Sequence, residues 1–93
     1  MRTYEAVIIF RPDSELRAAG REFARSLFTA DGCKVLKEDE MGDRELAYEV
    51  KGSKRGFYVV FELETSPESI STFDRALKLR SEILKYLFVR KDR

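Results

Sequence analysis

The sequence predicts a small α+β domain with the element order strand, helix, strand, strand, helix, strand. Three observations support this order. Four segments alternate along a strand period, two segments repeat apolar residues every three or four positions, and glycine or proline lies between most segments. A length of 93 residues suits one domain with one modest core, so we expect residues 1–93 to form a single domain.

The first strand is expected at residues 2–11, which carry apolar residues at both odd and even positions near the middle. This pattern predicts a central strand that is covered on both sides. Pro12 ends the strand because proline has no amide hydrogen to donate to a sheet. A helix over residues 15–30 follows, with Asp13 or Ser14 as its N-cap. Its apolar stripe is expected at Leu16, Ala19, Phe23, Leu27 and Ala30.

Glycines mark the breaks in the next part of the chain. Asp31-Gly32 should end the helix, with the glycine in the left-handed conformation. Gly20, inside the helix, costs about 1 kcal/mol relative to alanine and should permit close packing. Residues 33–51 are expected to form a long strand with a bulge or kink at Gly42. The turn 52–56 then reverses the chain and makes a hairpin with the strand that follows.

The second half of the chain repeats the same order. A strand over residues 57–64 precedes a helix that starts at Ser66-Pro67-Glu68, where a cap, a first-turn proline and a first-turn acid stand together. The apolar stripe of this helix is expected at Ile70, Phe73 and Leu77. Residues 83–89 form the last strand. The order is that of the split βαβ, or ferredoxin-like, fold: a four-stranded antiparallel sheet with two helices on one face.

Two helices cover only one face of such a sheet and leave the other face open. Alternation along the third strand places four side chains on the core face: Phe57, Val59, Phe61 and Leu63. The opposite face then collects apolar and aromatic side chains that nothing in the chain covers, which is typical of a partner surface. We expect this partner surface to comprise Tyr48, Tyr58, Val60, Leu87 and Val89, with Val7 and Ile9 beside them. The competing interpretation is that the strand parity is wrong at the kink and that Tyr48 belongs to the core.

Composition argues against catalysis. The chain has no histidine, the usual base of Ser-His-Asp and Cys-His mechanisms, and no asparagine, which some enzymes of this fold need. A single cysteine without histidine makes a metal site improbable, and we expect Cys33 to fill space. The acidic run Glu38-Asp39-Glu40 is interpreted as a solvated strand edge. We therefore expect no enzyme activity, no cofactor and no small-molecule substrate.

Hydropathy and charge limit the possible partners. No segment approaches the roughly 20 apolar residues of a membrane helix and no signal peptide is visible, so we expect a cytoplasmic protein without a membrane partner. A single cysteine agrees with a reducing compartment. The formal net charge is only +1, so any RNA site must come from local clusters of basic residues.

The RNA-recognition motif has the same architecture and carries stacking aromatic residues on its third strand. The segment Arg55–Glu62 begins in the same way and then departs from that pattern. Tyr58 stands in place of a small residue, and Val59 and Glu62 stand in place of aromatic residues. Because an anionic Glu62 would repel phosphate, we do not expect bases to stack on the sheet.

A family resemblance rests first on the segment Gly42-Asp43-Arg44-Glu45-Leu46-Ala47-Tyr48-Glu49-Val50-Lys51. Nine of its ten positions match the signature of the bacterial small-subunit ribosomal protein six family, with Val50 in place of the usual isoleucine. Further matches are the opening Met1-Arg2-Thr3-Tyr4-Glu5, the aromatic Gly56-Phe57-Tyr58, and Leu77-Lys78-Leu79-Arg80. The resemblance covers essentially the whole chain.

The resemblance implies a structural, non-catalytic role in the small ribosomal subunit. It implies binding to 16S ribosomal RNA in the central domain, in the platform region, as a heterodimer with small-subunit ribosomal protein eighteen on the open face. The phosphate contacts it implies are Arg2, Arg44, Lys51, Lys54, Arg55, Lys78, Arg80 and Lys85. Glu45 occupies a slot that is often basic in relatives, which should weaken the local attraction for RNA. The alternative is a ferredoxin-like ligand-sensing or regulatory module.

Overall fold

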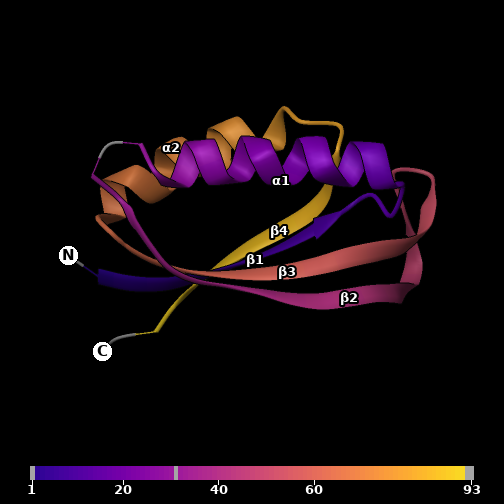
Figure 1. The fold of residues 1–93 in the computed structure, drawn as a ribbon, viewed down its shortest axis with the longest axis horizontal. Coiled ribbons are helices and arrows are strands. Elements are labelled where there is room, and N and C mark those ends of the chain that lie inside the picture. The colour runs from indigo at the N-terminus through magenta and orange to yellow at the C-terminus, as the bar shows by residue number, and fades with distance from the viewer. Residues whose placement is uncertain (1, 31, 92–93) are drawn as a thin grey trace.

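A computed structural model describes residues 2–30 and 32–91. Its elements are β1 Arg2–Phe10, α1 Ser14–Phe28, β2 Lys34–Val50, β3 Ser53–Thr65, α2 Pro67–Lys78 and β4 Ile83–Arg90 (Figure 1). The strands form one sheet in the order β2-β3-β1-β4, and each strand is antiparallel to its neighbours. Both helices lie on the same side of the sheet (Figure 1). The predicted ferredoxin-like fold is confirmed, with β1 in the interior of the sheet.

Both helices begin where the sequence offers a cap. Asp13 accepts hydrogen bonds from two backbone amides of the first turn of α1, at 3.0 and 3.1 Å, and Ser66 caps α2 in the same manner. These bonds satisfy amides that have no partner inside the helix. The first helix ends at Phe28, slightly earlier than expected, and Gly32 beyond it has a φ of 75°. Asp31, the other residue of the expected helix end, lies outside the described residues.

The hydrophobic core lies between the sheet and the helices. Fully buried strand residues include Ile8 and Phe10 of β1 and Val59 and Leu63 of β3, and the last two confirm the predicted core face of β3. The ring of Phe28 meets the rings of Phe61 and Phe73 edge-on, with centroids 5.2 and 5.1 Å apart. Such edge-to-face pairs stabilise the core beyond the area that they bury. Phe73 and Leu77 of α2 are buried and Ile70 packs against them, so the predicted stripe of α2 is confirmed.

The predicted apolar stripe of α1 is wrong by about one position. The residues that α1 buries are Gly20, Ala24 and Phe28. Of the predicted set, Phe23 and Leu27 are partly buried, and the exposed ones are Leu16, Ala19 and Ala30. A Cβ atom on Gly20 would lie 2.7 Å from Cδ1 of Phe10, so the helix contacts the sheet through its smallest residues. Gly20 has the close-packing role that the sequence predicts.

The hairpin between β2 and β3 is tighter than predicted. Lys51 and Gly52 alone form the turn, so β3 begins at Ser53 and not after a turn over residues 52–56. Both turn residues have positive φ, 49° and 79°, as a type I′ hairpin turn requires. The bulge predicted at Gly42 is confirmed by a φ of 96° and a shift of the strand register just before it.

Candidate protein and nucleic-acid interface

The open face of the sheet carries the residues of the predicted partner surface. At its centre, Val7 of β1 lies between Val60 of β3 and Leu87 of β4. Leu87 is 60% exposed and Val89 is 41% exposed, whereas Val7 and Val60 are half-buried. Figure 1 shows both helices on the other side of the sheet. The expectation that β1 is covered on both sides is therefore wrong for this chain by itself.

An apolar hollow lies at one end of the open face, where the end of β2 approaches β1 and β4. Its volume is about 150 Å³, and its lining comprises Ile9, Leu46, Ala47, Tyr48, Val50, Tyr58, Leu84 and Lys85. Tyr48 is 65% exposed, so the interpretation of Tyr48 as a core residue is wrong. We call this feature the Tyr48 hollow.

Leu46 and Leu84 line the hollow, although neither belongs to the predicted partner surface. The pairing of β1 with β4 shifts register after Ile9, so Ile83 and Leu84 are both buried although they are adjacent in the chain. Gly56 lies beneath the hollow, and a Cβ atom there would be 2.3 Å from Cγ2 of Ile9 and 3.4 Å from Cδ2 of Leu46. Strict alternation cannot reveal such a bulge, because the extra residue reverses the faces of everything that follows.

Three of the predicted phosphate contacts lie close to the Tyr48 hollow. Lys85 donates a hydrogen bond from Nζ to the hydroxyl of Tyr48 at 3.1 Å. The guanidinium carbon of Arg44 lies 5.9 Å from the ring centroid of Tyr58. Lys51 donates a hydrogen bond at 2.9 Å to a backbone carbonyl of β4, so its ammonium group helps to hold the hairpin against that strand.

Three other predicted phosphate contacts pair with acidic side chains. Arg55 pairs with Asp43 across the hairpin at 2.9 Å, and Nζ of Lys78 lies 3.8 Å from Asp74 one helical turn earlier. Arg80 pairs with a nearby carboxylate at 2.9 Å and stacks its guanidinium 4.3 Å over an aromatic ring of α1. The first two pairs are well exposed, and exposed pairs contribute at most about 1 kcal/mol. A phosphate can replace the carboxylate in those two pairs at small cost.

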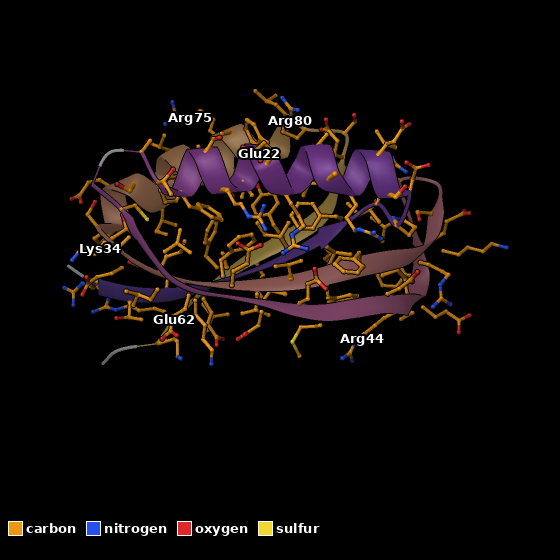
Figure 2. The ribbon with its side chains drawn as sticks, viewed as in Figure 1. Glu22, Lys34, Arg44, Glu62, Arg75 and Arg80 are labelled. Atoms are coloured by element: carbon orange, nitrogen blue, oxygen red, sulfur yellow. The ribbon has the colours of Figure 1, made fainter. Side chains whose placement is uncertain are left out.

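The last two predicted phosphate contacts, Arg2 and Lys54, are exposed. Neither side chain has an ion-pair or hydrogen-bond partner among the residues that the structure describes. Arg2 starts β1 and lies far along the sheet from Lys54 at the hairpin. Figure 2 shows Arg80 on the helix side and Arg44 on the open side of the sheet. The structure thus distributes the eight predicted contacts over several places and does not gather them into one patch.

A group of ion pairs joins α1 to the edge strand β2 on the helix side. Glu38 pairs with Arg25 at 2.8 Å and with Arg21, which also pairs with Glu40. Hydrogen bonding to Arg25 lowers the pKa of Glu38, against the raising effect of its burial. The Glu38 side chain is only 18% exposed, so the interpretation of this acidic run as a solvated edge is wrong for Glu38. The arginines hold it ionised and bonded, which suits a structural role.

Cys33 is buried, and burial raises the pKa of its thiol. A thiol with a raised pKa stays protonated at neutral pH and is a poor nucleophile. Within residues 2–30 and 32–91, no three or more His, Cys, Asp or Glu side chains gather as a metal-binding group. The described helices include none that is long and apolar enough to cross a membrane.

The fold and the open face together define a class of protein: a small ferredoxin-like domain that exposes an apolar, aromatic sheet surface with cations at its edge. Residues 3–90 match the family model of ribosomal protein S6, so the chain belongs to the ribosomal protein S6 family. This membership makes it a structural, non-enzymatic protein of the small ribosomal subunit. It confirms the resemblance and the expected lack of catalysis.

Curated relatives and solved structures agree over the full length of the chain. The small ribosomal subunit protein bS6 of Treponema pallidum (strain Nichols) is 38% identical over 92 residues, which are 99% of each chain. The bS6 protein of Treponema denticola is 37% identical over 90 residues, 97% of each chain. The crystal structure of 30S ribosomal protein S6 from Thermotoga maritima gives a TM-score of 0.87 at 25% identity, over 97% of this chain and 87% of that one. The C-terminal domain of MgtC from Mycobacterium tuberculosis, at 12% identity and a TM-score of 0.67, shares the fold alone.

Proposed function

We propose that this protein binds 16S ribosomal RNA in the central domain, in the platform region, as a heterodimer with small-subunit ribosomal protein eighteen. It acts as part of cytoplasmic ribosomes. The observation that carries the proposal is the open apolar face, which this chain leaves uncovered although family membership makes it a component of a large assembly. A contiguous exposed apolar surface of this kind is typical of a protein interface.

The protein partner occupies the open face. The proposed contact residues are Tyr48, Tyr58, Val60, Leu87 and Val89. Tyr48 and Leu87 are the most exposed of them, at 65% and 60%, so they gain the most from burial. Burying one such side chain completely contributes roughly 1.5–3 kcal/mol. Tyrosine is also enriched in protein interfaces, where its ring packs and its hydroxyl bonds.

The RNA is bound by basic side chains, some at the edge of this surface and the others beyond it. The proposed phosphate contacts remain Arg2, Arg44, Lys51, Lys54, Arg55, Lys78, Arg80 and Lys85. Arginine suits this task because its planar fork meets two phosphate oxygens at once. With a net charge of only +1 and several of these cations already paired, binding to RNA by the chain alone is weak and strongly salt-dependent. A basic partner therefore contributes much of the affinity.

A ligand-sensing module is the competing proposal, and membership of the ribosomal protein S6 family argues against it. The Tyr48 hollow, at about 150 Å³, is smaller than the roughly 300–1,000 Å³ of most small-molecule pockets and suits one side chain of a protein partner. A larger hollow of about 380 Å³ lies beside it along the apolar row, over Val7, Ile9 and Leu87. A thermal-shift screen with amino acids and nucleotides is expected to leave the unfolding temperature unchanged.

The proposal is tested by placing a charge in the open face. Leu87→Asp puts a carboxylate in the apolar row, and Leu79→Asp makes the same change at a residue that is 82% exposed just beyond α2, outside that row. Both positions are exposed, so both variants should fold. Titration calorimetry with purified protein eighteen is expected to show lost binding for Leu87→Asp and unchanged binding for Leu79→Asp.

The same proteins are then titrated with a 16S central-domain fragment at physiological salt. The wild-type chain should bind the RNA poorly alone and well together with protein eighteen. Unchanged binding of protein eighteen by Leu87→Asp would refute the interface. Nanomolar RNA binding by the chain alone would refute the division of labour between the two proteins.

A further inference from the structure

Two glutamates face each other on the open side of the sheet. Glu5 of β1 lies directly opposite Glu62 of β3, next to the apolar row of Val7, Val60 and Leu87. Like charges directly opposite on neighbouring strands are destabilising. Glu5 also belongs to the opening motif of the family resemblance, and it has no part in the proposed RNA contacts. Repulsion between the two carboxylates therefore works against the stability of the sheet.

One lysine serves both carboxylates. Nζ of Lys91 lies 3.8 Å from Oε2 of Glu5 and 3.3 Å from Oε2 of Glu62. Lys37 faces Glu62 from β2, but its Nζ lies 3.6 Å from Asp39. Among residues 2–30 and 32–91, this one ammonium group contacts both carboxylates, so the described part of the cluster carries a net negative charge. The side chains of Glu5, Glu62 and Lys91 are 38%, 27% and 41% exposed, so a cation from outside can reach them.

The other end of the open face has the opposite character. Lys85 lies beside Ile9, four residues along β1 from Glu5, and Arg44 lies near the rim of the Tyr48 hollow. Four residues of a strand span about 13 Å at about 3.3 Å per residue. Figure 2 shows Glu62 and Arg44 on the open side of the sheet, well apart from each other. Along its length the face presents a carboxylate pair, an apolar row, and an apolar hollow edged by cations.

We infer that the protein partner presents a cationic side chain to Glu5 and Glu62 and an apolar side chain to the Tyr48 hollow, about 13 Å away. The inference rests on the proposed function and adds the contacts that set the partner's orientation. Lys91 is an internal substitute, which the partner's cation displaces. Arginine suits the carboxylate pair because its guanidinium donates several hydrogen bonds in one plane.

Charge complementarity selects the occupant. An RNA strand would bring phosphates against Glu5 and Glu62 and would be repelled. A basic protein places its charge where the carboxylates are, and a partner docked in the reverse orientation would meet Lys85 and Arg44 instead. Such complementarity contributes to orientation and specificity as much as to affinity.

The test removes each charge in turn and measures binding of purified protein eighteen by titration calorimetry at low and moderate salt. The Glu62→Gln variant is expected to bind about tenfold more weakly, because hydrogen bonds between charged groups are lost. The double variant with Glu5→Gln and Glu62→Gln is expected to bind more weakly still. Lys91→Met should tighten binding about two- to fivefold because no internal cation has to be displaced. Glu22→Gln, the same charge change on the helix side (Figure 2), should leave binding unchanged. Thermal unfolding of every variant checks that each is folded.

The outcomes separate this inference from the function on which it rests. If protein eighteen does not bind the wild-type chain, the proposed heterodimer fails. If it binds the wild type and both glutamate variants equally, the heterodimer stands and the carboxylate contact is refuted. Weaker binding by Lys91→Met would show that Lys91 contacts the partner directly and is not a substitute. A dimer of this chain that Glu62→Gln dissociates would make a second copy the occupant and refute the inference.

Discussion

Gly56→Ala places one methyl group beneath the Tyr48 hollow. The new Cβ would lie 2.3 Å from Cγ2 of Ile9 and 3.4 Å from Cδ2 of Leu46. Carbon atoms attract best at about 3.5–4.0 Å, so the first contact is a severe overlap. Ile9 cannot turn away freely, because a β-branched side chain is stiff at χ1. Either the backbone of β3 or the side chain of Ile9 must move.

The size of the effect follows from two opposing contributions. Overpacking a methyl group costs roughly 1–3 kcal/mol. Replacing glycine by alanine in a strand returns about 0.5–1 kcal/mol, because the unfolded chain loses conformational freedom. Because a contact of 2.3 Å is a severe overlap, the cost lies in the upper half of its range, and the net expectation is a loss of about 1–2 kcal/mol in the free energy of unfolding. For a domain of this size, that corresponds to a decrease of about 4–16 °C in the unfolding temperature.

Thermal and urea unfolding followed by circular dichroism measure this loss. A double-mutant cycle with Ile9→Ala isolates its cause, because alanine removes the Cγ2 atom that the new methyl group would strike. In the Ile9→Ala background, Gly56→Ala is expected to be neutral or stabilising. A Gly56→Ala protein as stable as the wild type would refute the reasoning. An equal loss in both backgrounds would refute the contact with Ile9 as its cause.

Two predictions concern pH. The hydrogen bond to Arg25 lowers the pKa of Glu38 in the folded protein. The ion pairs of Glu38 therefore stabilise the protein fully above the ordinary glutamate pKa of about 4.5, and this stabilisation is lost as the pH falls through the lower pKa of the folded state. The difference in unfolding free energy between wild type and Glu38→Gln, from urea titrations, should therefore shrink below about pH 4.5; a constant difference down to acid pH would contradict this. Burial, with a hydrogen bond to Asp74, raises the pKa of Tyr86 to about 12, so its hydroxyl stabilises the fold below the ordinary pKa of 10.0 and progressively less as pH rises toward 12. Between pH 10 and pH 12, the Tyr86→Phe variant should lose less stability than the wild type. An equal loss in both proteins would contradict the stabilising role of the Tyr86 hydroxyl.

The tertiary packing explains why the predicted stripe of α1 was wrong. A search for large apolar residues at helical spacing selects Leu16 and Phe23, yet α1 rests on the sheet through Gly20 and Ala24. Where α1 approaches the sheet closely, its smallest residues face the strands, because a larger side chain at Gly20 would overlap Phe10. No pattern within the helix shows how near the sheet lies.

The Glu38 pairs and the Tyr48 hollow were missed for a similar reason. Glu38 faces the helix side of β2, where alternation alone predicts an apolar residue, and only the position of α1 brings Arg21 and Arg25 to it. Leu84 joins the hollow because a register shift turns it to the open face. Bulges and inter-element distances are set by the whole fold, so a period of two or 3.6 residues cannot show them.

The sequence by itself determined the order of elements, the helix caps, the bulge at Gly42 and the buried face of β3. Each of these depends on neighbours in the chain. A helix cap depends on the next three residues, and the face of a strand depends on alternate positions. The tertiary structure alone decided which face of α1 is buried, how the hairpin reaches β4, and that Glu5 stands opposite Glu62. Those features depend on residues far apart in the chain, and the pairing of strands is what brings them together.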